Sequence, residues 1–207
     1  MTTLINKWSK RSDDANEVSM QDDHFLERAI RGERTALVYL VKKYKDLAYT
    51  VAIKVVANRE DAEEVVQDAF MKAFASLREF RRASKFSTWL YRIVYNTALT
   101  KISRRKLVTV DIDGQNETDV CVSRTDQQFD LLEHAERKKY IHLALGKLSR
   151  DDYLVISLHY IGEKSIAEIC QILDMKKSAV KMRLLRGRKQ LQAELEALLS
   201  LEIRNLL

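Results

Sequence analysis

Aromatic and basic residues alternate along residues 80–105, FRRASKFSTWLYRIVYNTALTKISRR. Single-stranded nucleic acid is held by bases that stack on aromatic side chains and by cations along its backbone. The candidate contacts are aromatic, basic or, in one case, an amide that can hydrogen-bond an unpaired base: Phe80, Lys85, Phe86, Trp89, Tyr91, Arg92 and Asn96. Aromatic side chains also build hydrophobic cores. We favour the core for Trp89, and both interpretations stay open for Phe80, Phe86 and Tyr91.

A second basic stretch, residues 165–190, has the form of a helix-turn-helix. Ser165 and Glu168 have the spacing of a capping box, and residues 174–175 predict a tight turn before the second helix. The second helix fits the major groove of duplex DNA, and its candidate contacts are Lys177, Lys181, Arg183, Arg186 and Arg188. An ordinary amphipathic surface helix would also alternate apolar and charged faces. The absence of any acidic residue from 176 to 192 favours the DNA-binding interpretation.

A third stretch, residues 58–74, combines an acidic first turn with an apolar stripe. Such a helix can present an interaction face to a protein partner. On the pattern alone, a solvated amphipathic helix is an equally good interpretation.

No catalytic arrangement accompanies these stretches. The sequence has no glycine-rich phosphate loop, no His-Glu-x-x-His and no Cys-x-x-Cys, and its four histidines are scattered. Cys121 and Cys170 lack metal-ligand spacing and are expected to be reduced thiols. We therefore expect no enzyme activity, no catalytic residue, no metal and no cofactor. No apolar run is long enough for membrane insertion, and the start of the chain lacks the apolar core of a secretory signal.

These stretches lie in a chain whose composition predicts an all-α fold. It has no proline and only five glycines among 207 residues. Apolar periodicity and capping residues predict eight helices, over residues 23–32, 35–57, 59–77, 87–106, 131–147, 150–160, 165–173 and 178–199.

Charge divides the chain into parts. Residues 24–106 carry a net charge of +9 and residues 133–207 a net charge of +4, whereas residues 107–132 carry −5. Basic blocks suit polyanionic partners. The polar, acidic composition of residues 107–132 predicts a flexible linker. We expect an N-terminal tail (1–23), a first helical domain (24–106), the linker (107–132) and a helix-turn-helix domain (133–207).

The three stretches, in this order, resemble the extracytoplasmic-function (ECF) class of bacterial sigma factors, in the sigma-70 superfamily. The resemblance is carried by NREDAEEVVQDAFMKAF (58–74), FRRASKFSTWLYRIVYNTAL (80–99) and ALGKLSRDDYLVISLHYIGEKSIAEICQILDMKKSAVKMRLLRGRKQL (144–191). It implies a sigma-2-like domain that binds core RNA polymerase and the −10 element, and a sigma-4-like domain that binds the −35 element. It also implies polymerase contacts at Asp61, Glu64, Gln67, Asp68 and Phe70.

The implied function is promoter-specific transcription initiation with assisted strand opening. The implied partners are the β′ and β subunits of core RNA polymerase, promoter DNA as duplex and as single non-template strand, and an anti-sigma factor, all in the cytoplasm. Asn96 and the loop 80–88 would hold a flipped base. The family often has Phe-Arg-Gly-Asp-Ser where this chain has Phe80-Arg81-Arg82-Ala83-Ser84, which predicts an unusual promoter preference.

Two rival functions remain at this point. The chain could be an ordinary repressor or activator that uses only the helix-turn-helix, with residues 24–106 as a ligand or dimer domain. It could also be a nucleic-acid enzyme, although no metal or nucleophile motif supports that class.

Overall fold

The structure is a computed structural model that describes residues 22–108 and 140–206. Within these residues it contains helices and no strands, so the predicted all-α class is confirmed. The N-terminal unit consists of helical residues 22–30, α2 (Arg34–Val56), α3 (Arg59–Ala75), the short 3₁₀ helix η1 (Leu77–Glu79) and α4 (Phe86–Val108). The C-terminal unit consists of helical residues 140–146, α6 (Arg150–Tyr160), α7 (Ile166–Leu173) and α8 (Lys177–Leu206).

The helices begin close to the predicted positions, because the capping residues act as expected. The Asn58 side chain accepts a hydrogen bond from the Asp61 backbone N–H at 2.9 Å and starts α3. The capping box of α7 is complete: the Glu168 backbone N–H donates to the Ser165 hydroxyl, and the Glu168 carboxylate accepts from the Ser165 backbone N–H. Gly32, with φ of +86°, ends the first helical segment as predicted.

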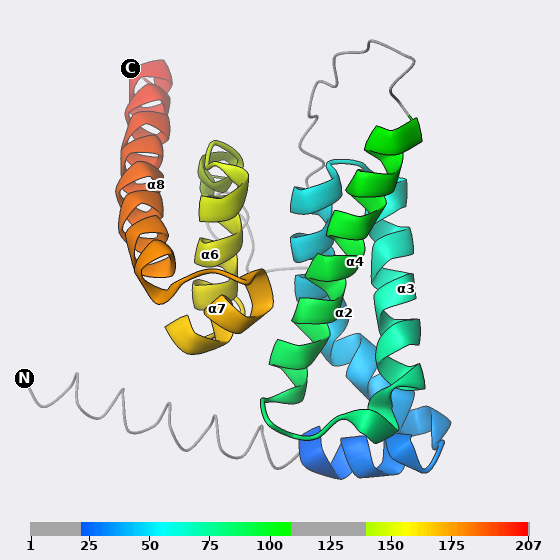
Figure 1. Cartoon of the computed structure of the whole chain (residues 1–207). Coiled ribbons are helices and arrows are strands. Elements are labelled where there is room, and N and C mark those ends of the chain that lie inside the picture. Colours follow the sequence, from blue (N-terminus) through cyan, green and yellow to red (C-terminus); the bar gives the residue numbers. More distant parts are fainter. Residues whose placement is uncertain (1–21, 109–139, 207) are drawn as a thin grey trace, which may run out of the picture.

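In the N-terminal unit, α2, α3 and α4 pack lengthwise against one another (Figure 1). Their shared core consists of buried aliphatic and small residues that recur three or four positions apart, such as Leu40, Val51, Val65, Leu90 and Val94. This bundle displays one side of α3 and one side of α4 to solvent.

In the C-terminal unit, α6 and α7 pack against the first half of α8. Val180 and Leu184 of α8 are buried, and Gly187 permits close approach, since a Cβ there would lie 2.9 Å from Cγ1 of Ile156 in α6. The second half of α8 extends beyond this core (Figure 1).

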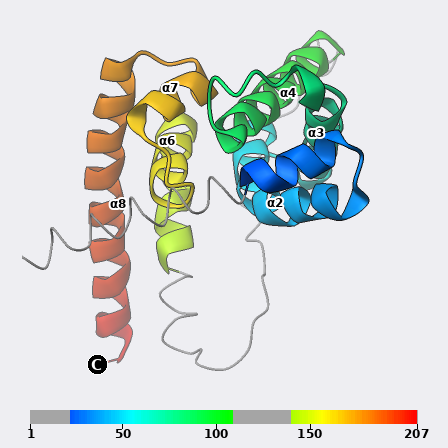
Figure 2. The same cartoon turned by 90° about the horizontal axis from the view of Figure 1, so that it is seen from below.

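The two units also touch. α7 packs against α4, and α6 packs against α2. Both views show α7 between α8 and the start of α4 (Figures 1 and 2). The predicted tail except its last two residues, most of the predicted linker and residues 131–139 of the fifth predicted helix lie outside the described residues.

Candidate nucleic-acid and polymerase interfaces

The helix-turn-helix has the predicted geometry. α7 ends at Asp174 in the left-handed conformation, with φ of +53°, and the Met175 backbone N–H donates to the Cys170 carbonyl at 3.2 Å. α8 begins three positions after Asp174, at Lys177. Because this turn is short and Val180 of α8 is buried in the core, the opposite side of α8 faces solvent.

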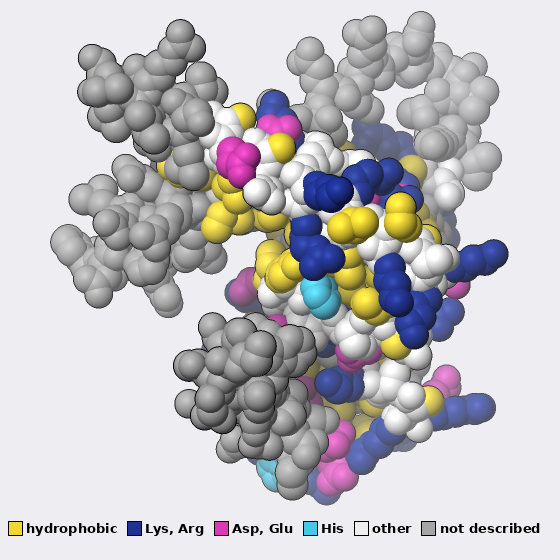
Figure 3. Space-filling model, turned by 90° about the vertical axis from the view of Figure 1, so that its left-hand side faces the viewer, with side chains coloured by type: hydrophobic (Ala, Val, Ile, Leu, Met, Phe, Trp, Pro, Cys, Tyr) yellow, Lys and Arg dark blue, Asp and Glu magenta, His cyan; other side chains and the backbone are white. Residues whose placement is uncertain are grey.

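The outward side of α8 carries most of its cations. Lys177, Lys181 and Arg188 are exposed, as the DNA-binding interpretation requires. Lysine and arginine side chains lie in a broken band among apolar ones on the side of the molecule that carries α8 (Figure 3). On α8 itself, the apolar residues Met182 and Leu185 are exposed at positions between the cations. Sequence reasoning did not select them, although an apolar residue beside lysines on a recognition helix suits contact with thymine methyl groups.

Arg183 and Arg186, also predicted to contact DNA, are held by carboxylates of α6. Arg186 donates two hydrogen bonds of 2.9 Å to Asp152, and Arg183 bonds Asp152 at 3.3 Å and pairs with Asp151 at 2.7 Å. Asp152 is only 1% exposed, and the Ser149 hydroxyl also donates to it at 2.8 Å. Burial by itself raises the pKa of Asp152, but the bonds from Arg186 and Ser149 outweigh it and hold the pKa below its usual value.

The Asp152 cluster ties the recognition helix to α6. The sequence alone does not reveal this role of Asp152, because its arginine partners lie 31 and 34 positions away. Arg186 remains 61% exposed in spite of these bonds, so its guanidinium stays accessible at the surface of α8.

The stretch 80–96 divides into a buried and an exposed set. Phe86 and Tyr91 are each 3% exposed and belong to the core. Phe80 and Trp89 are partly buried, with ring centroids 4.9 Å apart, and Phe86 lies 5.8 Å from Trp89. The packing of Trp89 therefore agrees with the core interpretation favoured for it. Phe86 and Tyr91, for which both interpretations were open, are also core residues.

The exposed set consists of Lys85, Arg92 and Asn96. Arg92 and Asn96 are one helical turn apart, so they share a face of α4. An exposed amide on a rigid helix beside a cation is suited to reading an unpaired base while the cation attracts the neighbouring phosphate.

The predicted polymerase face on α3 is partly bonded to α4. Lys101 pairs with Asp61 at 3.2 Å and also with Glu64, and the hydrogen bond that Lys101 donates to Glu64 raises the pKa of Lys101. Gln67 and Asp68 are exposed.

Of the apolar residues near this face, the predicted contact Phe70 is buried and its neighbour Met71 is exposed. Phe70 is 5% exposed, with its ring 5.8 Å from that of Phe74, so it belongs to the core. Met71, next to Phe70, is 69% exposed beside Gln67 and Asp68. A large exposed apolar side chain in a polar setting is a mark of a protein interface, and the signal for it in the sequence is a methionine close to the polar residues Gln67 and Asp68.

In residues 22–108 and 140–206, no group of three or more His, Cys, Asp or Glu side chains is arranged to hold a metal ion. Among the same residues, no helix is both long and apolar enough to cross a membrane.

Two family models match the chain in the order of its two helical units. The model described as Sigma-70 region 2 matches residues 40–108, and that described as Sigma-70, region 4 matches residues 138–191. Together they cover more than half of the chain.

Curated relatives extend the similarity. The ECF RNA polymerase sigma factor SigW of Bacillus subtilis is 30% identical over 179 residues, which cover 84% of this chain and 96% of the relative. The RNA polymerase sigma-H factor of Pseudomonas aeruginosa is 28% identical over 193 residues, which cover 86% of this chain and 96% of the relative.

Two solved structures show the same arrangement of elements. The sigma factor RpoE of Bartonella quintana, in complex with the anti-sigma factor NepR, matches with a TM-score of 0.63 at 25% identity and covers 76% of this chain and 95% of its own. CnrH, in complex with the cytosolic domain of CnrY, matches with a TM-score of 0.55 at 25% identity and covers 85% of this chain and 97% of its own.

Proposed function

The chain belongs to the ECF class of sigma-70 factors, which direct promoter-specific transcription initiation, and from this membership we propose how its two helical units divide that work. The observation that carries the proposal is the match of two sigma families, in order, to the two units. The N-terminal unit would bind core RNA polymerase and the −10 element, and the C-terminal unit the −35 element. This division corresponds to domains at 24–106 and 133–207, joined by the acidic segment 107–132.

Polymerase binding is assigned to the exposed side of α3. Gln67, Asp68 and Met71 offer polar, acidic and apolar surface on one side of the helix, and Glu64 and Asp61 lie about one and two turns before Asp68. The core subunits β′ and β are the proposed partners. Phe70 supports this surface from beneath and does not form it, because its ring is buried.

Capture of the opened −10 strand is assigned to Asn96, Arg92 and Lys85, with Phe80 and Trp89 as a stacking platform at the loop 80–88. The three polar side chains are exposed, and the two rings are partly buried and packed together. Phe86 and Tyr91 would hold the platform in place from the core. Base capture of this kind assists strand opening without covalent chemistry.

Recognition of −35 duplex DNA is assigned to α8. Lys177, Lys181 and Arg188 would attract phosphates, and Met182 and Leu185 would face base edges. Arg183 and Arg186 would act from fixed positions, because Asp152 holds both guanidinium groups.

An anti-sigma factor is a further proposed partner. One structural neighbour, RpoE of Bartonella quintana, is a sigma factor in complex with the anti-sigma factor NepR. The site of action would be the cytoplasm, where bacterial RNA polymerase and DNA are found.

The decisive experiment is run-off transcription with core polymerase and genomic promoter fragments. Transcripts that start only when this chain is added are the expected result. Binding of specific duplex DNA by the chain alone, with no added transcription, would instead favour a repressor or activator that uses only the helix-turn-helix.

A further inference from the structure

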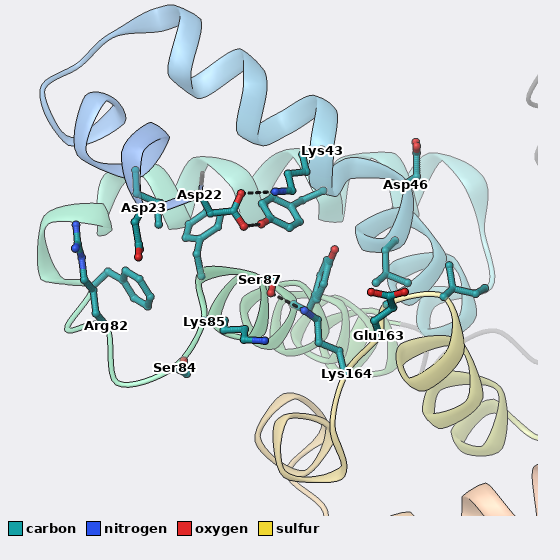
Figure 4. Close-up of a pocket in the computed structure, with 18 residues that line it drawn as sticks. Asp22, Asp23, Lys43, Asp46, Arg82, Ser84, Lys85, Ser87, Glu163 and Lys164 are labelled. Carbon is teal, nitrogen blue, oxygen red and sulfur yellow. Dashed lines mark hydrogen bonds and ion pairs between the residues drawn. The ribbon is translucent and has the colours of Figure 1, made fainter. Parts of the chain in front are cut away.

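The loop that precedes α4 is tied to the first helical segment by one ion pair, which we call the loop latch. The latch joins Arg82 of the loop 80–88 to Glu27 of helical residues 22–30, with 3.3 Å between Nη2 of the arginine and Oε1 of the glutamate. The loop runs beside the first helical segment, and the Arg82 side chain extends from it (Figures 1 and 4). Because the two residues are 55 positions apart, the latch is a tertiary contact that no local pattern reveals.

Arg82 adopts a backbone conformation that ordinarily belongs to glycine. Its φ is +52°, in the left-handed region that a residue with a Cβ disfavours. The ECF pattern often has glycine at this position, as noted above, whereas this chain has arginine. A residue in a sparsely populated backbone region keeps that conformation only where the surrounding structure fixes it, and such residues gather at functional sites. The loop therefore requires a contact that compensates for the Cβ of Arg82.

Within the described residues, little else fixes this part of the loop. Arg81, Arg82 and Ala83 are exposed, and no backbone N–H of residues 81–84 donates to a backbone carbonyl there. Arg82 and Ser84 border a pocket of about 620 Å³, so this part of the loop is not packed into the core (Figure 4). The latch is thus the contact that can hold residues 81–84 in place.

The other end of the latch lies on a firmly held helix. Leu26, next to the glutamate of the latch, is 1% exposed. Phe25 stacks on Tyr39 of α2, with 3.7 Å between the ring centroids. Asp22 accepts a hydrogen bond from Lys43 of α2 at 2.5 Å (Figure 4). The glutamate is therefore presented to the loop from a fixed position.

The latch lies within the part of the loop that the proposed function assigns to the opened −10 strand. Arg82 stands between Phe80, which forms the stacking platform with Trp89, and the exposed cation Lys85. Contacts that are held in place before binding increase affinity, because less freedom is lost when the ligand arrives. Flexible loops, by contrast, adapt to more than one ligand. A fixed loop should therefore discriminate better between bases than a mobile one.

We propose that Glu27 is a positioning residue for promoter recognition, which holds the loop 80–88 in one conformation through Arg82 and thereby increases discrimination between −10 bases. The inference rests on the −10 role assigned above to this loop. Glu27 acts only through Arg82 and is not itself a DNA contact. The side chains of Arg82 and Glu27 are 46% and 56% exposed, so the latch should shift the equilibrium of the loop by about twofold to fivefold.

Trypsin measures the mobility of the loop in the full-length chain without any DNA. Glu27→Gln breaks the latch and leaves the tryptic site at Arg82 unchanged. Cleavage after Arg82, followed by mass spectrometry, should be about twofold to fivefold faster in this variant, because cleavage follows the fraction of open loop. The matched control is Glu79→Gln, an exposed residue just before the loop with the same change of charge, which should be cleaved at the wild-type rate. Equal rates in both variants overturn the latch.

Base discrimination is measured on the complex of the chain with core polymerase. The probes are forked fragments of a promoter identified by run-off transcription, in which the −10 non-template strand is unpaired and one base at a time is substituted. Glu27→Gln should reduce the ratio of affinities for the original and the substituted base by about twofold to fivefold, although loss of a negative charge favours DNA binding in general. Glu79→Gln should keep the wild-type ratio. An unchanged ratio in Glu27→Gln overturns the positioning role.

A double-mutant cycle shows whether Glu27 acts through Arg82. In the Arg82→Gln background, Glu27→Gln should change the ratio of affinities no further, because the latch is already broken. Arg82→Lys, which keeps the charge, should retain most of the wild-type ratio. Losses that add in the double variant would show that the two residues act separately and would overturn the proposal.

Run-off transcription separates this inference from the proposed function. If the wild-type chain supports no transcription with core polymerase, the proposed function fails, whereas trypsin still decides whether the latch fixes the loop. If transcription depends on the chain and Glu27→Gln keeps full discrimination, the proposed function stands and the positioning role of Glu27 fails.

Discussion

Asp152 receives hydrogen bonds from Arg183, Arg186 and Ser149 while almost fully buried, so its charge is satisfied only in the folded C-terminal unit. Removal of one partner from a buried ion pair lowers the free energy of unfolding by about 3–5 kcal/mol, and by less where the remaining partner is solvated. We expect Asp152→Asn to lower the free energy of unfolding by roughly 2 kcal/mol at pH 7, because Arg186 is largely exposed. Urea denaturation measures this difference.

The effect of Asp152 should depend on pH in a defined direction. Because folding lowers its pKa, the carboxylate contributes its full stability above the ordinary value of 3.8 and loses it as the pH falls through the lower folded value. The difference between wild type and Asp152→Asn should therefore shrink below about pH 4. The control is Asp151→Asn, which removes a more exposed carboxylate from the same helix. It should lower the free energy of unfolding by less than Asp152→Asn does. An equal cost for both variants would contradict the anchoring role of Asp152.

Asn96 is exposed on the same face of α4 as Arg92, and the proposed function assigns it to an unpaired base. We expect Asn96→Ala to reduce run-off transcription from duplex promoters about tenfold, since a lost base contact costs about 1–3 kcal/mol. Affinity for core polymerase, measured by fluorescence titration, should stay within about twofold, because Asn96 lies outside the proposed α3 face. Equal losses in transcription and in polymerase affinity would remove the base-reading role.

At the scale of elements, α3 presents two surfaces with different tasks. One side packs on α2 and α4, and the other carries Gln67, Asp68 and Met71 to solvent. The ion pairs of Lys101 with Asp61 and Glu64 hold the start of α3 on α4, so the exposed side has a fixed orientation.

Asp68→Arg should weaken association with core polymerase by tenfold or more, because it replaces an acidic contact with a like charge against a basic partner surface. The control is Glu63→Arg on the same helix. Glu63 is exposed and lies five residues away, about 140° around the helix axis, and its only described ion pair is a surface pair with Arg59. Affinities that fall equally in both variants would indicate general electrostatics and not a contact at α3.

At the scale of the whole molecule, α7 packs against α4 and α6 against α2, whereas elements centred near −10 and −35 lie roughly 85 Å apart on duplex DNA, so binding of both elements predicts a large change of shape. Fluorophores attached at residue 75, at the end of α3, and at residue 171, on α7, occupy exposed positions of the two units. With Cys121 and Cys170 replaced by serine, energy transfer should be efficient in the free chain and should be lost in the complex of polymerase and promoter. Transfer that stays efficient in that complex would contradict separation of the units.

The division into two linked units also affects the affinity for promoter DNA. Under the proposed function, each unit contacts DNA weakly until polymerase holds both in place, where the second contact becomes intramolecular.

The sequence by itself determined the class of fold, the helices and the family. Periodicity and caps are local signals, so Asn58, Ser165 and Gly32 define helix ends without knowledge of distant partners. It also determined that the helix from Lys177 onward is basic and turned outward, since Val180 and Leu184 mark its buried side.

Only the tertiary structure decided which side chains are available. Phe70, Phe86 and Tyr91 resemble candidate contacts in the sequence but are buried, and Met71 is exposed where pattern alone did not select it. The pairing of Asp152 with α8 and the docking of Lys164 on Ser87 join residues more than 30 positions apart. Periodicity shows which face of a helix is apolar, but the burial of a polar group depends on what folds against it.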